Sequence, residues 1–503
     1  MAIASVVVPT MIVLFALFIL GRKASFSSGR VFSVFLVGCI VYGVLIRFIL
    51  APATGHPVDM ETWTDPIRLF YGSGVVDVRL YPLPFTYYPV LASYSPYALL
   101  QVLGFHDISF LSHQVGMVES VFIKFPFIFS DIFSFYFLYK ILGRLNADDR
   151  SKRLAYALLY FLSPIVILSS SAWPLADGIA VALFLAGIYY ALLEEKPVIG
   201  SIFFALSGFT KIFGFLGFVP LAVDLVRKHK FSKLLIIIGV FLFIAFLLYL
   251  PLINFSGIGG VSTFFTQFLK GRAGFGSSFG ASDTYLSYLS FIGFPIDASF
   301  QTYLLGALFA SVTIYYIFKV RKLNLATKKS QFLDLTFLYF ALFFFIFYLT
   351  FYKVYQYYYL LVIPFLIIYA YSKRESGSAY AAVILSLVSA PIFLLGPLVS
   401  GTDYYWIPLN IPADTQILAV IPSTVVAFAL LGILNLKGPL RILKTDLGFI
   451  VSSGIATWFT FGFAYYGYYN FPFLGIIWYF ISLILILMSA AFFYLRRKIG
   501  SKS

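Results

Sequence analysis

The chain has 503 residues, of which 61% are hydrophobic and only 11% are charged. A soluble globular protein averages about 25% charged residues, so this composition excludes a soluble fold and predicts a polytopic membrane protein. The net charge of +15 raises the question of a nucleic-acid partner. The single cysteine, Cys39, excludes an internal disulfide.

The chain begins with an apolar run over residues 3–20, which is followed by the basic segment GRKASFSSGR. A cleaved signal peptide carries its positive charge before the apolar core, so the reverse order predicts a retained helix. A second run, 31–50, leads into a first long loop at 51–122. This loop is rich in apolar and aromatic residues, and we expect it to contain short helices that lie in the membrane interface.

Further apolar runs follow in chain order, and several reach the length of about 18 residues that indicates a membrane span. They cover residues 123–142, 153–171, 175–193, 233–254, 301–320, 332–351, 357–371, 379–399, 415–436, 447–468 and 473–495. A second long loop, 255–300, is rich in glycine, and we expect it to be mobile like a lid. If the stretch 198–226 forms two short segments, the chain has about 15 membrane segments.

The stretch 198–226 decides the predicted topology. Suppose that GRKASFSSGR is cytoplasmic: the later loops rich in Lys and Arg are cytoplasmic too only if this stretch crosses twice. Lys211 then lies at the turn, on the outer side. Under this topology most of the 35 Lys and Arg residues are cytoplasmic, whereas the 20 acidic residues show no such bias. The basic excess therefore indicates orientation in the membrane, and it requires no nucleic-acid partner.

Ionisable side chains inside membrane segments are costly, so they are candidates for function. Here they are Arg47, Lys124, Asp131, Asp177, Lys211 and Lys353. Lys124 and Asp131 share a helix face but are too far apart for a direct pair, so they either join neighbouring helices or serve the function. Asp177 lies early in a helix, where the dipole favours a carboxylate, and it either supports the structure or contacts the substrate.

Three cations are predicted on the outer face, namely Lys211, Lys353 and Arg272 in the glycine-rich loop. They would either contact lipid head groups or bind a phosphate, which suits both Arg and Lys. Asp59, in GHPVDMETWTDP, is the best candidate for a general base that takes a proton from a sugar hydroxyl. Glu61 would join Asp59 around a divalent cation, Mg²⁺ or Mn²⁺, if the reaction needs one.

Several stretches, taken in order, resemble the GT-C superfamily of membrane glycosyltransferases, which use polyprenyl- or dolichyl-phosphate sugars as donors. HPVDMETWTDP is similar to the opening of the family's first external loop, with Asp59 at the base position and Trp63 at its aromatic companion. LYPLPFTYYPVL, which contains Tyr88, is similar to the later tyrosine-proline stretch of that loop.

The resemblance continues in the membrane segments. LSPIVILSSSAWPLADGIAVALF is similar to a segment in which Pro, Trp and Asp recur, with Asp177 at the last position. ALSGFTKIFGFLGFVPLAV resembles the family's short hairpin, with Lys211 facing the site. FYKVYQYYYLLVIPFL resembles a later helix entry that contains Lys353, and Gln356 stands in a polar pair where many members carry His or Glu.

The resemblance implies transfer of a single hexose, with mannose as one candidate, from a polyprenyl-phosphate carrier to a lipid-linked or surface glycan. The transfer would invert the anomeric carbon on the extracytoplasmic or lumenal face. Asp59 would be the base, and Lys211, Arg272 and Lys353 would bind the donor phosphate. The residues expected to bind or support substrate are Glu61, Trp63, Tyr88, Asp177 and Gln356.

These inferences predict an all-α membrane protein in three parts. Residues 1–30 form an extra N-terminal helix and a cytoplasmic loop, residues 31–300 form the GT-C catalytic module, and residues 301–503 form C-terminal membrane helices. The alternatives are a secondary transporter or lipid flippase, and a membrane scaffold without catalysis. Transporters often show internal repeats and charges at the bilayer midplane, and neither is evident here, which favours the enzyme.

Overall fold

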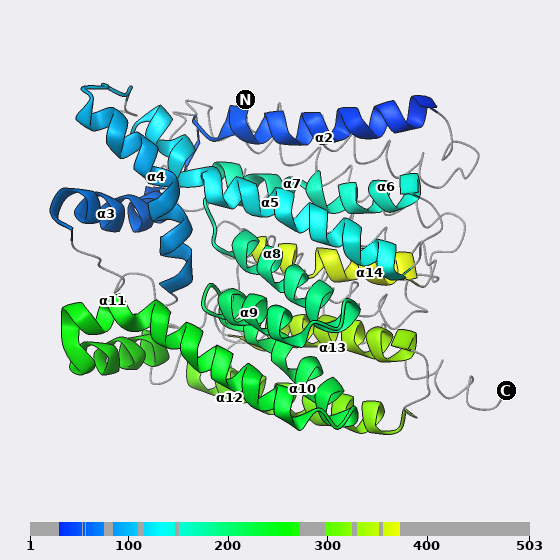
Figure 1. Ribbon diagram of the computed structural model, residues 1–503. Helices are drawn as coiled ribbons and strands as arrows, with labels where there is room; N and C mark the ends of the chain where they lie inside the picture. Colours follow the sequence, from blue (N-terminus) through cyan, green and yellow to red (C-terminus); the bar gives the residue numbers. More distant parts are fainter. Residues whose placement is uncertain are drawn as a thin grey trace, which may run out of the picture. The chain divides into compact units, whose positions relative to one another are not determined.

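The structure is a computed structural model that describes residues 30–52, 54–55, 57–74, 84–108, 115–145, 150–271, 297–323, 329–351 and 356–372. Every regular element in these ranges is a helix, which confirms the all-α class (Figure 1). Described residues up to Thr266 belong to one compact unit, and those from Gln267 onward belong to a second. The predicted segments at 3–20 and beyond residue 372 lie outside the described residues.

The first unit contains most of the described helices. They are α2 (Arg30–Leu50), α3 (Pro57–Ser73), η2 (Pro84–Thr86), α4 (Tyr87–Val102), α5 (Met117–Leu145), α6 (Arg150–Phe161), α7 (Pro164–Ile167), η3 (Leu168–Ala172), α8 (Asp177–Ile188), η4 (Tyr189–Leu193), α9 (Pro197–Gly208), η5 (Ile212–Gly217), α10 (Phe218–Arg227) and α11 (Phe231–Gly271). The short elements η2 and η5 are 3₁₀-helices, whereas η3 and η4 are π-helical turns.

Helix α5 is the centre of this unit, because it contacts α4, α6 and α8. Phe127, Ile128 and Leu138 of α5 are buried in the unit, whereas Phe125 and Phe129 are exposed. Exposed apolar side chains opposite a buried face suit lipid hydrocarbon, so the pattern fits a membrane helix. Figure 1 shows α2, α5 and α6 lying side by side, with α3 and α4 at one end of these helices.

Three described helices are long and apolar enough to cross a membrane: Met117–Leu145, Phe231–Pro251 and Ser299–Arg321. A fourth span would be the bent pair Arg150–Phe161 and Ile165–Ala172, whose parts meet at 56°. The run predicted at 153–171 is therefore broken, because Pro164 lacks an amide hydrogen and begins a new helix. The described helices fit a membrane protein, and the number of about 15 segments stays a prediction.

The stretch 198–226 forms a hairpin, as predicted. It divides into α9 and α10, with Lys211 between them at the turn. The ends of the hairpin meet, since Lys228 Nζ lies 3.9 Å from Glu195 Oε1. One arm of the hairpin is α9, and the other is η5 followed directly by α10. That this stretch crosses the membrane twice stays a prediction.

Helix α5 connects two ends of the first unit, and the second of them carries the basic residues Arg144, Lys196 and Lys228. At its N-terminal part, Ser120 Oγ donates to the carbonyl of Ala51 (2.8 Å), so the start of the first loop lies here. At its C-terminal part, Arg144 forms an ion pair with Glu194, beside the hairpin ends. We call these the loop end and the basic end. The length of α5, 29 residues, separates them by about 43 Å.

The prediction of a loop over residues 255–300 is wrong for its first part, because α11 continues as a helix to Gly271. The prediction took the glycines of this stretch as a sign of a loop. Each glycine costs a helix only about 1 kcal/mol, and no proline follows Pro251 within α11 to stop it. The rest of the predicted lid, including Arg272, lies outside the described residues.

The second unit contains α12 (Ala298–Arg321), α13 (Lys329–Thr350), η7 (Gln356–Leu361) and α14 (Ile363–Ser372). Asp297 caps α12 by accepting a hydrogen bond from the amide of Ser299 (3.1 Å). Helices α12 and α13 are joined by a hydrogen bond between the hydroxyls of Tyr316 and Thr336 (2.9 Å). Polar contacts of this kind join helices in an apolar setting.

Candidate active site and the adjoining pocket

Two buried cations of the first unit have structural partners. Lys124 Nζ donates to the carbonyl oxygens of Ala51 (2.9 Å) and Thr54, at the turn that precedes α3. Arg47 Nε donates to Asp131 Oδ2 (2.7 Å), and the hydroxyl of Ser170 donates to the same oxygen (2.6 Å). The predicted alternative that Lys124 and Asp131 join neighbouring segments is therefore supported, and each has its own partners.

Asp59 lies in the first turn of α3 and is half-buried. Trp173 Nε1 donates a hydrogen bond to Asp59 Oδ2 from the segment between η3 and α8. One helical turn after Asp59, Trp63 Nε1 donates to the carbonyl of Pro174 (2.9 Å). Two indoles therefore tie α3 to residues 173–174 in both directions, and this double contact holds the carboxylate of Asp59 in place.

Trp63, expected as the aromatic companion of the base, lies in the core of the first unit and is only 2% exposed. Its ring packs against the rings of Tyr87 and Phe127, with centroid distances of 5.7 and 5.3 Å. Trp63 therefore packs in the core next to the site, and it is the indole of Trp173 that donates a hydrogen bond to the carboxylate of Asp59. The sequence had assigned Trp173 no role beside the base.

Asp177 and Lys211 form an ion pair beside Asp59. Lys211 Nζ lies 3.2 Å from Asp177 Oδ2, where Asp177 is 1% exposed and Lys211 is 24% exposed. Asp177 follows Trp173 by four positions, and the Trp173 indole donates to Asp59, so the pair lies near Asp59. We call Asp59, Trp173, Asp177 and Lys211 the Asp59 cluster. It joins α3, the start of α8 and the hairpin turn, so three segments distant in sequence contribute to it.

The remaining predicted residues have different positions. Tyr88 donates its hydroxyl hydrogen to the carbonyl of Leu248 (3.0 Å) and so joins α4 to α11. Glu61 is exposed and lies two residues from Asp59 on α3, so the helix turns the two carboxylates apart. Within the part of the chain that the structure describes, no group of three or more metal-binding side chains occurs. Arg272, Lys353 and the side chain of Gln356 lie outside it.

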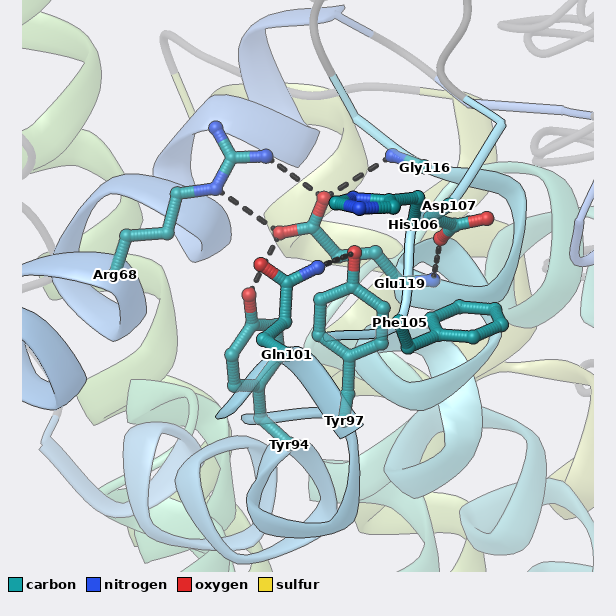
Figure 2. A pocket seen from close by; sticks show the side chains of 9 residues that line it. All are labelled: Arg68, Tyr94, Tyr97, Gln101, Phe105, His106, Asp107, Gly116 and Glu119. Carbon is teal, nitrogen blue, oxygen red and sulfur yellow. Dashed lines mark hydrogen bonds and ion pairs between the residues drawn. The ribbon is translucent and has the colours of Figure 1, made fainter. Parts of the chain in front are cut away.

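The sequence analysis missed a second polar site at the loop end, shown in Figure 2. Arg68 of α3 forms a two-armed ion pair with Glu119 of α5, with Nε–Oε1 at 3.0 Å and the second arm at 2.7 Å. Tyr94 donates to Glu119 Oε1 (2.8 Å), and the amide of Gly116 donates to Oε2 (3.1 Å). A pair separated by 51 positions leaves no local signal, so only the tertiary structure reveals it.

Asp107 completes the frame of this site by capping α5. Its carboxylate accepts hydrogen bonds from the amides of Val118 (3.2 Å) and Glu119 (2.8 Å), where a helix N-terminus favours negative charge. Burial raises the pKa values of the Tyr94 and Tyr97 hydroxyls, and the charge of Glu119 raises both further. The frame borders a cavity of about 360 Å³.

A scan against protein-family models and a search of curated proteins return no match for the chain. The functional argument therefore depends on the chemistry of the Asp59 cluster and on its place in the unit.

Proposed function

We propose that the protein is an integral membrane glycosyltransferase of the GT-C type. It would transfer one hexose, with mannose as one candidate, from a polyprenyl-phosphate donor to a lipid-linked or surface glycan. The observation that carries this proposal is the Asp59 cluster. A half-buried carboxylate is held by an indole N–H and lies near a buried carboxylate–lysine pair.

In this reaction Asp59 accepts the proton of the attacking acceptor hydroxyl. The hydroxyl oxygen forms the new glycosidic bond at the anomeric carbon, and the bond to the donor phosphate breaks on the opposite face, which inverts that carbon. The phosphate leaves on its lipid carrier. General-base assistance of this kind contributes about 10²- to 10⁴-fold to a rate, and the hydrogen bond from Trp173 sets the orientation of the carboxylate.

Lys211 is the described cation that suits the departing phosphate. Asp177 holds its ammonium group from one side, and the lysine retains 24% exposure. A cation fixed beside the leaving group stabilises the charge that develops in the transition state. Arg272 and Lys353 are proposed to add to this site on the basis of the sequence.

The orientation is part of the proposal. Arg144, Lys196 and Lys228 gather at the basic end, where Arg144 meets Glu194 and Lys228 meets Glu195. The positive-inside rule assigns such an end to the cytoplasm. The loop end, with the Asp59 cluster, would then face the extracytoplasmic or lumenal side of a multi-pass protein.

The test uses purified protein in detergent with synthetic polyprenyl-phosphate mannose or glucose and a panel of glycan acceptors. Asp59→Asn keeps the size of the side chain but removes the base, and we expect transfer to fall at least about 100-fold. Asp65→Asn is the matched control, because Asp65 is an exposed acid on the same helix. Undiminished transfer by Asp59→Asn would exclude Asp59 as the base. If no donor supports transfer but the protein moves labelled polyprenyl phosphate across vesicles, the flippase alternative replaces the proposal.

A further inference from the structure

The cavity of Figure 2 is lined in part by α3, the helix that carries Asp59, but Asp59 itself is not part of the lining. Arg68, in its wall, follows Asp59 by nine positions on α3, which corresponds to about 13 Å along a helix axis. The volume of about 360 Å³ falls within the range of about 300–1,000 Å³ that is typical of small-molecule sites. The cavity is therefore large enough for a ligand group and too far away for that group to react at Asp59.

The inner wall of the cavity is preorganised. The carboxylate of Glu119 accepts four hydrogen bonds, two from Arg68 and one each from Tyr94 and Gly116. Asp107 is engaged with the amides at the start of α5. These charged groups form a rigid frame across α3, α4 and α5, so a ligand would meet little cost for ordering the wall.

The rim of the cavity presents groups of a different kind. Gln101, Phe105 and His106 are exposed at its edge. Gln101 Nε2 donates to the hydroxyl of Tyr97 (2.8 Å), and this bond fixes the plane of the amide. Figure 2 shows the ring of Phe105 on the side of Asp107, across from the amide of Gln101. The rim thus combines hydrogen-bonding groups with an aromatic ring, which matches the hydroxyls and the apolar faces of a pyranose ring.

The charge of the lining argues against an anionic ligand. One guanidinium, of Arg68, stands against the two carboxylates of Asp107 and Glu119, and both donating arms of the guanidinium that face Glu119 are engaged with it. A phosphate would therefore meet net repulsion here. The described part of the Asp59 cluster has the same balance of one cation and two carboxylates, and there the proposal relies on Arg272 and Lys353 to reverse it. A neutral, hydroxyl-rich ligand carries no such penalty.

We propose that this cavity binds a sugar residue of the acceptor oligosaccharide, away from the hydroxyl that reacts. This inference rests on the proposed glycosyl transfer and adds the class of acceptor, a neutral glycan several sugars long. Gln101 and His106 would bond to sugar hydroxyls, and Phe105 would pack against a ring face. Nine positions at about 3.6 residues per turn put Arg68 and Asp59 on opposite sides of α3, so the rest of the glycan would pass around this helix to reach Asp59.

The test measures binding without turnover, in the Asp59→Asn variant of the full chain. Ligand-observed NMR titrations use mannose, mannobiose and mannotetraose, and the corresponding glucose series. We expect affinity to increase with length, and Gln101→Ala to weaken tetrasaccharide binding about 3- to 10-fold, the effect of one neutral hydrogen bond. Phe105→Ala should weaken it as well. Ser95→Ala, an exposed residue of α4 outside the cavity lining, is the matched control.

The inference is overturned if neither sugar series binds, or if Gln101→Ala and Phe105→Ala bind the tetrasaccharides as tightly as Ser95→Ala. A phosphate-containing ligand that competes at this cavity would also overturn it. Transfer assays with otherwise wild-type protein keep the two proposals apart. Full activity of Asp59→Asn contradicts the glycosyltransferase mechanism, whereas equal losses of kcat/KM for long and short acceptors in Gln101→Ala contradict only the acceptor site.

Discussion

Replacing Trp173 by Phe is a direct test of how Asp59 is held. The substitution keeps an aromatic ring but removes the Nε1–H group that donates to Asp59 Oδ2. Hydrogen bonds to charged groups are worth about 1.5–3 kcal/mol. If the hydrogen bond stabilises the transition state by this amount, its removal lowers kcat about 10- to 150-fold.

The assay compares initial rates over a range of donor concentrations, so that kcat and KM separate. We expect kcat to decrease and the KM for the donor to change less, since the Trp173 indole donates to the base. Trp63→Phe is the matched control. Its indole donates to a neutral carbonyl, that of Pro174, and a neutral bond is worth only about 0.5–1.5 kcal/mol. Trp63→Phe should therefore lower the melting temperature, and its kcat should fall less than the kcat of Trp173→Phe.

Two results would refute this reasoning. The first is a Trp173→Phe enzyme with kcat within twofold of the wild type while Asp59→Asn is inactive. The base would then act without the indole bond. The second is an equal loss of kcat in Trp173→Phe and Trp63→Phe, which would mean that both rings act by packing alone.

The remaining predictions concern stability. Arg47→Met should lower the free energy of unfolding by about 3–5 kcal/mol, because it leaves the buried carboxylate of Asp131 without its cation. The double variant Arg47→Met, Asp131→Asn should recover part of this loss in thermal melts in detergent. A loss below about 1 kcal/mol in the single variant would contradict a stabilising role of the Arg47–Asp131 ion pair. Folding raises the pKa values of Tyr94 and Tyr97 above the unfolded value of about 10. Their contribution to stability is complete below pH 10 and decreases above it, by up to about 1.4 kcal/mol per residue and pH unit. The melting temperature of the wild type should therefore fall between pH 10 and 11.5. The melting temperature of Tyr97→Phe should fall less steeply over the same range, and an equal dependence on pH in the two proteins would contradict this prediction.

Local sequence patterns were sufficient for several helices and for two features of the site. An apolar run must satisfy its backbone hydrogen bonds internally in a membrane, so the run at 31–50 predicts α2 within one residue, whereas the run at 123–142 predicts α5 without its first six residues. The charge of the loops was sufficient for the reversal at Lys211, which the hairpin of α9 and α10 confirms. The position of Asp177 in the first turn of a helix was also correct.

The partners of these residues were decided only by the tertiary structure. Trp173 and Asp59 are separated by 114 positions, and Arg68 and Glu119 by 51. Periodicity and composition describe neighbours along the chain, and they contain no information about which distant side chains meet. Trp63 was expected at the carboxylate because of the family resemblance, which likewise does not say which distant side chains meet in this chain. Its spacing from Asp59 places both on one side of α3, but the packing of residues 173–174 against that helix brings Trp173 to Asp59 and buries Trp63 in the core.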